Sequence, residues 1–123
     1  MLKYLILSLD VIASSAVAQD LPTAISCYQD ASNSKDIGAY MDCFSDDAEM
    51  IDVSRTFNGH DAIRPWALRE VIPNGDTFRH RKILDEREGY AKTDVNWLSW
   101  IDHYSYWWDE DGKITKMSLR YAD

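Results

Sequence analysis

The sequence is poor in the residues that interrupt a folded chain. Its 123 residues include only 3 prolines and 5 glycines, and no long stretch is rich in Pro, Gly or Ser. A chain of this length has room for one hydrophobic core and a short leader, and a second domain would not fit. With 46% hydrophobic and 28% charged residues, the composition is typical of a folded globular protein and not of a disordered or fibrous one.

Positive charge is also scarce, because 13 Lys and Arg stand against 21 Asp and Glu, which gives a formal net charge of -8. Binding to nucleic acid is driven by Lys and Arg that displace counterions from phosphates, so we expect no nucleic-acid partner. Acidic surfaces are repelled by anionic lipids, and no segment after the N-terminal one approaches the roughly 20 apolar residues that span a bilayer. We therefore expect no membrane partner for the mature protein.

Cysteine occurs only at Cys27 and Cys43, and the sequence has no C-x-x-C pair and no His and Cys cluster with zinc spacing. We therefore predict no metal site. The two cysteines lie at similar distances on either side of a break near Ser34, so an antiparallel helical hairpin would bring them level and allow a disulfide. Two separate buried thiols are the alternative, because a sequence does not fix the Cα separation that a disulfide requires.

The N-terminal segment has the pattern of a secretory signal peptide. Residues 1–18 contain an early Lys3, an apolar stretch and small residues up to Ala18. We predict cleavage near Ala18 and export, periplasmic or secreted, of a single mature domain at 19–123. Asp10 interrupts the apolar stretch, and an N-terminal helical extension is therefore the alternative.

Apolar residues at helical spacing predict three helices in the first half of the chain. The first helix begins near Leu21 and places Tyr28 on its buried stripe. After the break near Ser34, Asp36 is a credible N-cap for a second, short helix. A third helix ends at residues 73–75, where Pro, Asn and Gly follow one another.

The rest of the sequence has the period of strands, with Asp111 and Gly112 as a hairpin signal before the last one. Helices that precede antiparallel strands predict an α+β domain, in which three helices pack on the concave face of a cone-shaped, barrel-like antiparallel sheet. The predicted strands are 48–53, 77–87, 95–108 and 114–121.

Asp102 stands out in the long strand, because alternation places it in a row of aromatic and apolar residues, namely Leu98, Trp100, Tyr104, Tyr106 and Trp108. A carboxyl group among such side chains loses hydration, so its pKa should rise unless a cation or several donors compensate. The alternative is that Asp102 reaches water or pairs with an Arg. Asp52 shares the inner face of its strand with Met50, and Tyr28 lies on a helix stripe where a lone Tyr is usually core packing.

These residues resemble a known family. The segment 28–36 and the Asp-Asp-Ala that leads from Phe44 to Asp52 are similar to the helical hairpin and first strand of bacterial ketosteroid isomerases. Later segments keep the same order: Gly59 with Ala62, Ile63 and Arg64, then Ile101, Asp102, His103 and Tyr104, then Gly112, Lys113 and Ile114. The scaffold pattern is shared by the wider nuclear transport factor 2-like superfamily, including its SnoaL-like branch.

The resemblance implies an enzyme that moves a proton next to a carbonyl of a hydrophobic small molecule, in the manner of a 3-oxo-steroid delta-isomerase, without any cofactor. By this resemblance Asp52 is the base, while Tyr28 and protonated Asp102 donate hydrogen bonds to the substrate oxygen. The residues expected to contact the substrate are Trp100, Tyr104, Met50, His80 and Trp66.

Two other functions compete with the isomerase. A SnoaL-like polyketide cyclase or dehydratase favours a His and Asp pair, and His80 could supply the His, although such a residue is more often a half-exposed strand residue. A non-catalytic exported domain that binds a hydrophobic ligand is the other, since fold alone does not specify function. The opposite, outer face of the sheet is expected to carry Trp107, Ile101 and Ser105. An aromatic residue there indicates either a homodimer contact through the sheet or a surface covered by the chain's own loops.

Overall fold

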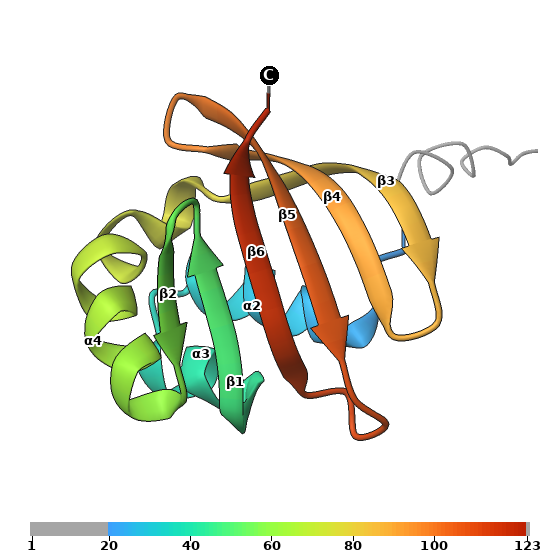
Figure 1. Ribbon diagram of the computed structural model, residues 1–123. Coiled ribbons are helices and arrows are strands. Elements are labelled where there is room, and N and C mark those ends of the chain that lie inside the picture. Colours follow the sequence, from blue (N-terminus) through green and yellow to red (C-terminus); the bar gives the residue numbers. More distant parts are fainter. Residues whose placement is uncertain (1–19, 123) are drawn as a thin grey trace, which may run out of the picture.

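The computed structural model describes residues 20–122, so the signal peptide predicted at 1–18 lies outside the described residues. Among the described residues, none of the helices has the length and apolar character needed to cross a membrane. The elements in chain order are α2 (Thr23–Asn33), α3 (Ile37–Asp42), β1 (Phe44–Asp52), β2 (Arg55–Asn58), α4 (His60–Glu70), the short 3-10 helix η2 (Ile72–Thr77), β3 (Arg79–Arg87), β4 (Tyr90–Trp97), β5 (Trp100–Trp108) and β6 (Ile114–Tyr121) (Figure 1).

The first two helices, α2 and α3, form the predicted hairpin. The apolar stripe of α2, which includes Tyr28, is buried as its helical spacing predicts. Asp36 is the N-cap of α3, where its Oδ1 accepts a hydrogen bond from the Ala39 N–H at 3.0 Å. Cys27 and Cys43 form a disulfide across the hairpin with a Cα–Cα distance of 5.9 Å, which confirms the predicted pairing.

The six strands form one curled sheet in the order β2-β1-β6-β5-β4-β3, and the helices lie against one face of it (Figure 1). This confirms the predicted α+β fold class, with one difference: β1 and β6 run parallel, so the sheet is mixed. Neighbouring strands joined by a hairpin must be antiparallel, whereas β1 and β6 are distant in sequence and no hairpin fixes their relative direction.

The prediction of one long strand over 95–108 is wrong. The chain reverses at Leu98 and Ser99, so that Trp97 pairs with Trp100. Residues 95–97 are the end of β4, which begins at Tyr90, and the rest of the segment after the turn is the antiparallel strand β5. Leu98 takes a positive φ of 57° and is 46% exposed, although the alternation placed it on the inner face. The turn lacks the Gly or Asn that usually marks a two-residue hairpin, so the sequence gives no signal for it.

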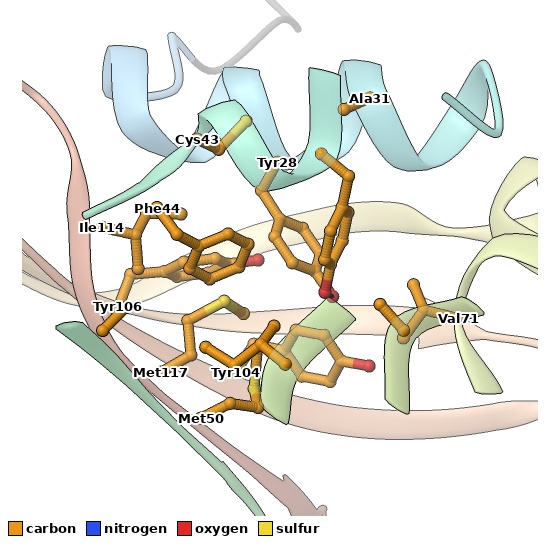
Figure 2. Packing of buried hydrophobic residues seen from close by; sticks show 14 of the residues in the cluster. Tyr28, Ala31, Cys43, Phe44, Met50, Val71, Tyr104, Tyr106, Ile114 and Met117 are labelled. Atoms are coloured by element: carbon orange, nitrogen blue, oxygen red, sulfur yellow. Dashed lines mark hydrogen bonds between the residues drawn. The ribbon is translucent and has the colours of Figure 1, made fainter. Parts of the chain in front are cut away.

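The core lies between the helices and the inner face of the sheet, and Tyr28 is at its centre. Its ring makes edge or tilted contacts with five aromatic rings, those of Tyr40, Phe44, Phe78, Tyr104 and Tyr106. Figure 2 shows Tyr28 reaching from the helices towards the strands that carry Tyr104 and Tyr106. Met50, on β1, is fully buried in the same cluster. Large rings from α2, α3, β1, β5 and the residue that precedes β3 therefore fill the inner part of the fold.

On the outer face of the sheet, Trp107 has neighbours from its own chain. The centroid of its ring lies 5.0 Å from that of the Tyr90 ring. The Lys116 ammonium lies over the Trp107 ring, 4.9 Å from the ring centroid. Ile101, on the same face of β5, is 39% exposed. The homodimer through this face stays a prediction.

Candidate functional site

A pocket of about 230 Å³ lies at one end of the sheet, where β1, β4 and β6 end and where β2 and β5 begin. The last turn of α4 closes one side of it. Three carboxyl groups line the pocket, those of Asp52, Glu70 and Asp102, and the rings around them include Trp66, Trp100 and Tyr104. Carboxyl groups that share a concave, aromatic site are candidates for acid and base chemistry.

Asp102 is the most buried of these carboxyl groups. The alternation of β5 turns it inward with Tyr104 and Tyr106, so that the residue is 8% exposed. Its Oδ1 is buried and has no hydrogen-bond partner among the described residues. Burial raises the pKa of Asp102, the nearby charge of Asp52 raises it further, and His103 opposes this shift. A carboxyl group in this setting tends towards the neutral acid, which can donate a hydrogen bond.

Asp52 ends β1 and has polar partners that Asp102 lacks. Its Oδ2 accepts a hydrogen bond from the Trp66 indole N–H at 3.2 Å and forms an ion pair with Arg55 Nη2. Arg55 is also bound to Glu70, through Nη1 to Oε2 at 3.0 Å and through Nη2 to Oε1 at 2.7 Å. The hydrogen bonds that Arg55 donates to Glu70 and Asp52 raise the pKa of its guanidinium above its usual range, so this cation is permanent.

Neither Arg55 nor Glu70 was among the site residues predicted from the sequence. A signal for Arg55 existed, because Arg55 pairs directly with Asp52 across the tight β1 to β2 turn. Recognising the short strand β2 would have placed the guanidinium beside the carboxylate. Glu70 lies at the end of α4, and only the packing of that helix brings it to Arg55.

Tyr28 does not line this pocket. Its hydroxyl accepts a hydrogen bond from the Tyr40 hydroxyl at 3.1 Å within the core, and burial raises its pKa well above the usual range. The phenol that reaches the pocket wall is Tyr104, whose hydroxyl points towards the pocket residue Val71 in Figure 2. The Tyr104 hydroxyl forms no hydrogen bond with another described residue.

The residues predicted to contact a substrate therefore divide into two groups. Trp66, Trp100 and Tyr104 line the pocket, whereas Met50 and His80 do not. His80 lies on β3, where its Nδ1 is 2.9 Å from the Gln29 amide oxygen and its Nε2 is 2.9 Å from the Tyr106 hydroxyl. Burial lowers the pKa of His80 to about 4, so the ring is neutral at pH 7.

No group of His, Cys, Asp and Glu side chains among residues 20–122 has an arrangement that could hold a metal ion. The three carboxyl groups of the pocket also differ in their surroundings. Arg55 binds those of Asp52 and Glu70, and it makes no contact with that of Asp102. The arrangement supports proton transfer between a carboxylate and a bound ligand, with an acid able to donate a hydrogen bond nearby.

No protein-family model and no curated protein sequence matches the chain. Solved structures do match it in fold. A SnoaL-like protein of unknown function from Burkholderia thailandensis is 16% identical with a TM-score of 0.69, and the match covers 80% of this chain and 92% of that chain. RV0760c from Mycobacterium tuberculosis, in complex with estradiol-17beta-hemisuccinate, is 11% identical with a TM-score of 0.70 over 80% and 91% of the two chains.

A third structure is that of SalBIII, an epoxide hydrolase/cyclase-like enzyme with a role in pyran ring formation in the polyether salinomycin. It is 14% identical with a TM-score of 0.65, and the match covers 80% of this chain and 88% of that chain. At these identities the likeness concerns the fold, which matches over most of both chains in each comparison. The chain has the nuclear transport factor 2-like fold, in the form found in SnoaL-like proteins.

Proposed function

We propose that the pocket binds a hydrophobic small molecule with a carbonyl group and moves a proton next to that carbonyl. The observation that carries the proposal is the pair of carboxyl groups in one pocket with opposite surroundings. Asp102 is buried without a hydrogen-bond partner at Oδ1, whereas Asp52 is held by a guanidinium and an indole N–H. Two acids in such different settings are suited to different roles in one reaction.

In the proposed reaction, the Asp52 carboxylate takes a proton from the carbon α to the carbonyl. The electron pair of that C–H bond moves into a dienolate, and its negative charge develops on the carbonyl oxygen. The neutral Asp102 carboxyl donates a hydrogen bond to that oxygen and stabilises the charge. Asp52 then returns the proton to the γ carbon, so that a β,γ-unsaturated ketone becomes the conjugated α,β-unsaturated ketone.

Two phenols are candidates for a second hydrogen-bond donor. The sequence resemblance assigns this role to Tyr28, which receives a hydrogen bond from Tyr40 and so keeps its own hydroxyl proton to donate. Tyr104 is favoured by its place in the pocket wall. Tyr28→Phe and Tyr104→Phe remove one hydroxyl each from the same core. The donor is the one whose loss lowers kcat, by about 100-fold or more if it acts like an oxyanion-hole donor.

The size of the pocket limits the substrate. Its volume of about 230 Å³ lies below the roughly 300–1,000 Å³ that is usual for sites of drug-sized ligands. A steroid would therefore extend past the mouth of the pocket, where Trp100 is 55% exposed and Tyr121 is 61% exposed. The assay should include cyclohex-3-enone, a small β,γ-unsaturated ketone, beside a 3-oxo-Δ5 steroid.

The test follows the absorbance of the conjugated enone as the purified protein acts on both substrates. A general base contributes about 10²–10⁴-fold, so Asp52→Asn should lower kcat/KM by at least about 100-fold. Asp46→Asn is the matched control, because Asp46 is an exposed carboxylate on the same strand. Equal rates for Asp52→Asn and the unsubstituted protein would rule out the isomerase.

A non-catalytic ligand-binding domain is the second candidate, and the ion pair with Arg55 favours it, because Asp52 Oδ2 is already occupied. Tight binding of the steroid without any turnover would support this reading. A cyclase or dehydratase that uses His80 is less favoured, because both ring nitrogens of His80 have partners in the core.

Export of the mature domain is part of the proposal, and the disulfide supports it, since disulfides persist in oxidising compartments. Cell fractionation with an antibody against the domain tests it. Retention of the full-length protein in a reducing cytoplasm would contradict export.

A further inference from the structure

Asp102 lies within a group of aromatic residues on the inner face of the sheet. Tyr121 of β6 is directly opposite Asp102 in the strand pairing, and Trp100 and Tyr104 are two residues before and after it on β5. Side chains at these positions point to the same face of a sheet and stand next to one another. All four residues line the pocket. The carboxyl group of Asp102 therefore has rings as neighbours on three sides.

Asp102 has no counter-ion within the described part of the chain. None of the ion pairs among residues 20–122 involves it, and its Oδ1 is buried without a hydrogen-bond partner. His103 follows Asp102 in sequence, but it lies on the opposite face of the sheet, where its Nε2 is 3.8 Å from Asp94 Oδ1. A buried polar group without a partner costs free energy, so in a pocket it marks a position where a ligand can supply the missing contact.

The other charged groups of the pocket do not make it a site for anions. Arg55 is bound to both Asp52 and Glu70, so this group of one guanidinium and two carboxylates has one net negative charge. Arg120 also lines the pocket, but it is exposed and alternates on β6 with buried Leu119, so its side chain starts from the outer face. The whole chain has a formal net charge of -8. The field of the protein therefore attracts cations and repels anions.

Two of the rings beside Asp102 are largely exposed. Trp100 is 55% exposed and Tyr121 is 61% exposed, and their ring centroids lie 5.9 Å apart. The faces of Trp and Tyr rings attract organic cations, and proteins recognise ammonium groups with rings of this kind. A metal ion would need several oxygen or nitrogen ligands instead, and no suitable group of His, Cys, Asp and Glu exists among the described residues.

We propose that the pocket binds a hydrophobic organic cation, such as a protonated amine, whose ammonium group pairs with the carboxylate of Asp102 and lies against the rings of Trp100 and Tyr121. This ligand class is separate from the carbonyl compound of the proposed function, and its binding requires no reaction. As the neutral acid, Asp102 donates a hydrogen bond to a carbonyl oxygen; as the carboxylate, it accepts one from an ammonium N–H. A cation beside the carboxyl group favours the ionised form, so an Asp102 that carries a proton releases it to solvent when the amine binds.

The test compares three ligands that share one ring and differ in charge: cyclohexylmethylammonium, cyclohexylmethanol and cyclohexanecarboxylate. Their dissociation constants are measured at pH 7 from the shifts of backbone amide signals in ¹H–¹⁵N NMR spectra. We expect the ammonium to bind at least about 10-fold more tightly than the alcohol, because a hydrogen bond between charged groups is stronger than a neutral one. The carboxylate should bind most weakly. The largest shifts should belong to residues around the pocket.

Asp102→Asn removes the negative charge and keeps the size of the side chain. It should lower the affinity for the ammonium by about 10-fold and leave the affinity for the alcohol nearly unchanged. Asp94→Asn is the matched control. Asp94 is also a buried Asp with an unpartnered Oδ1, but it lies on the outer face of the sheet, where its Oδ2 is 3.5 Å from Arg81 Nε. Both variants change the net charge equally, so Asp94→Asn reveals any effect of net charge alone.

Equal affinities for the ammonium and the alcohol would overturn the proposal. Equal losses of ammonium affinity in Asp102→Asn and Asp94→Asn would overturn it too, because the pairing with Asp102 would then be absent. A preference for the ammonium that is lost only in Asp102→Asn supports the proposal even if the protein converts no enone, in which case only the isomerase fails. Conversely, enone turnover without any preference for the ammonium keeps the isomerase and rejects this ligand class.

Discussion

Removal of the Cys27–Cys43 disulfide should lower the free energy of unfolding by about 3 kcal/mol. The bond joins residues 16 apart in sequence, and it ties α2 to the residue that follows α3. Closing a loop of this size removes chain entropy from the unfolded state, which gives about 3 kcal/mol in the loop-entropy model. For a domain of about 100 residues, each kcal/mol moves Tm by roughly 4–8 °C, so we expect a fall of about 12–24 °C.

The measurement is thermal unfolding followed by circular dichroism, for the oxidised protein, the protein in dithiothreitol, and Cys27→Ala/Cys43→Ala. The reduced protein retains both thiols, so it isolates the loss of the cross-link from the loss of side-chain packing at Cys43, which is buried. Both samples should unfold well below the oxidised protein. A fall of less than about 4 °C in the reduced protein would show that chain entropy is not what the bond supplies, and the reasoning would be refuted.

Two further predictions concern pH. Burial raises the pKa of Asp102, so ionising this carboxyl group lowers the stability of the folded state above its folded-state pKa. Asp102→Asn should therefore raise the free energy of unfolding at pH 7. Urea titrations at pH 7 and pH 3 should show that this gain disappears in acid. Burial lowers the pKa of His80 from 6.5 to about 4, so His80 binds a proton in the unfolded state at a higher pH than in the folded state. The free energy of unfolding should therefore fall as the pH is lowered from about 6.5 to 4. A series of urea titrations should show a smaller fall in His80→Gln. An unchanged pH dependence in either variant contradicts the corresponding assignment.

Periodic burial made much of the fold predictable from sequence. The helical spacing around Tyr28 and the alternation around Asp102 each follow from a regular element that hides one face, and both residues are buried as expected. The N-cap at Asp36 and the Cys27–Cys43 pair are local features of one hairpin, and local features can be read from short stretches of sequence.

Two kinds of feature could not be predicted in the same way, namely a turn without the residues that usually mark one, and contacts between distant segments. The reversal at Leu98 uses a residue with strong apolar character in a backbone conformation that normally favours Gly or Asn. Glu70 reaches Arg55 only because α4 packs beside β1 and β2. From the sequence pattern alone, both residues would be interpreted as ordinary charged residues on the protein surface. The depth of Tyr28 behind the pocket wall is likewise set by the packing of five neighbouring rings.

The indole rings of the pocket give the protein a built-in optical reporter. Of its 5 tryptophans, Trp66, Trp97 and Trp100 line the pocket, and they range from fully buried to more than half exposed. A molecule that enters will displace water from Trp100 and alter the surroundings of the other two, which changes the intensity and wavelength of the intrinsic emission. Compound collections can therefore be screened for ligands with the unlabelled protein, before any reaction has been established.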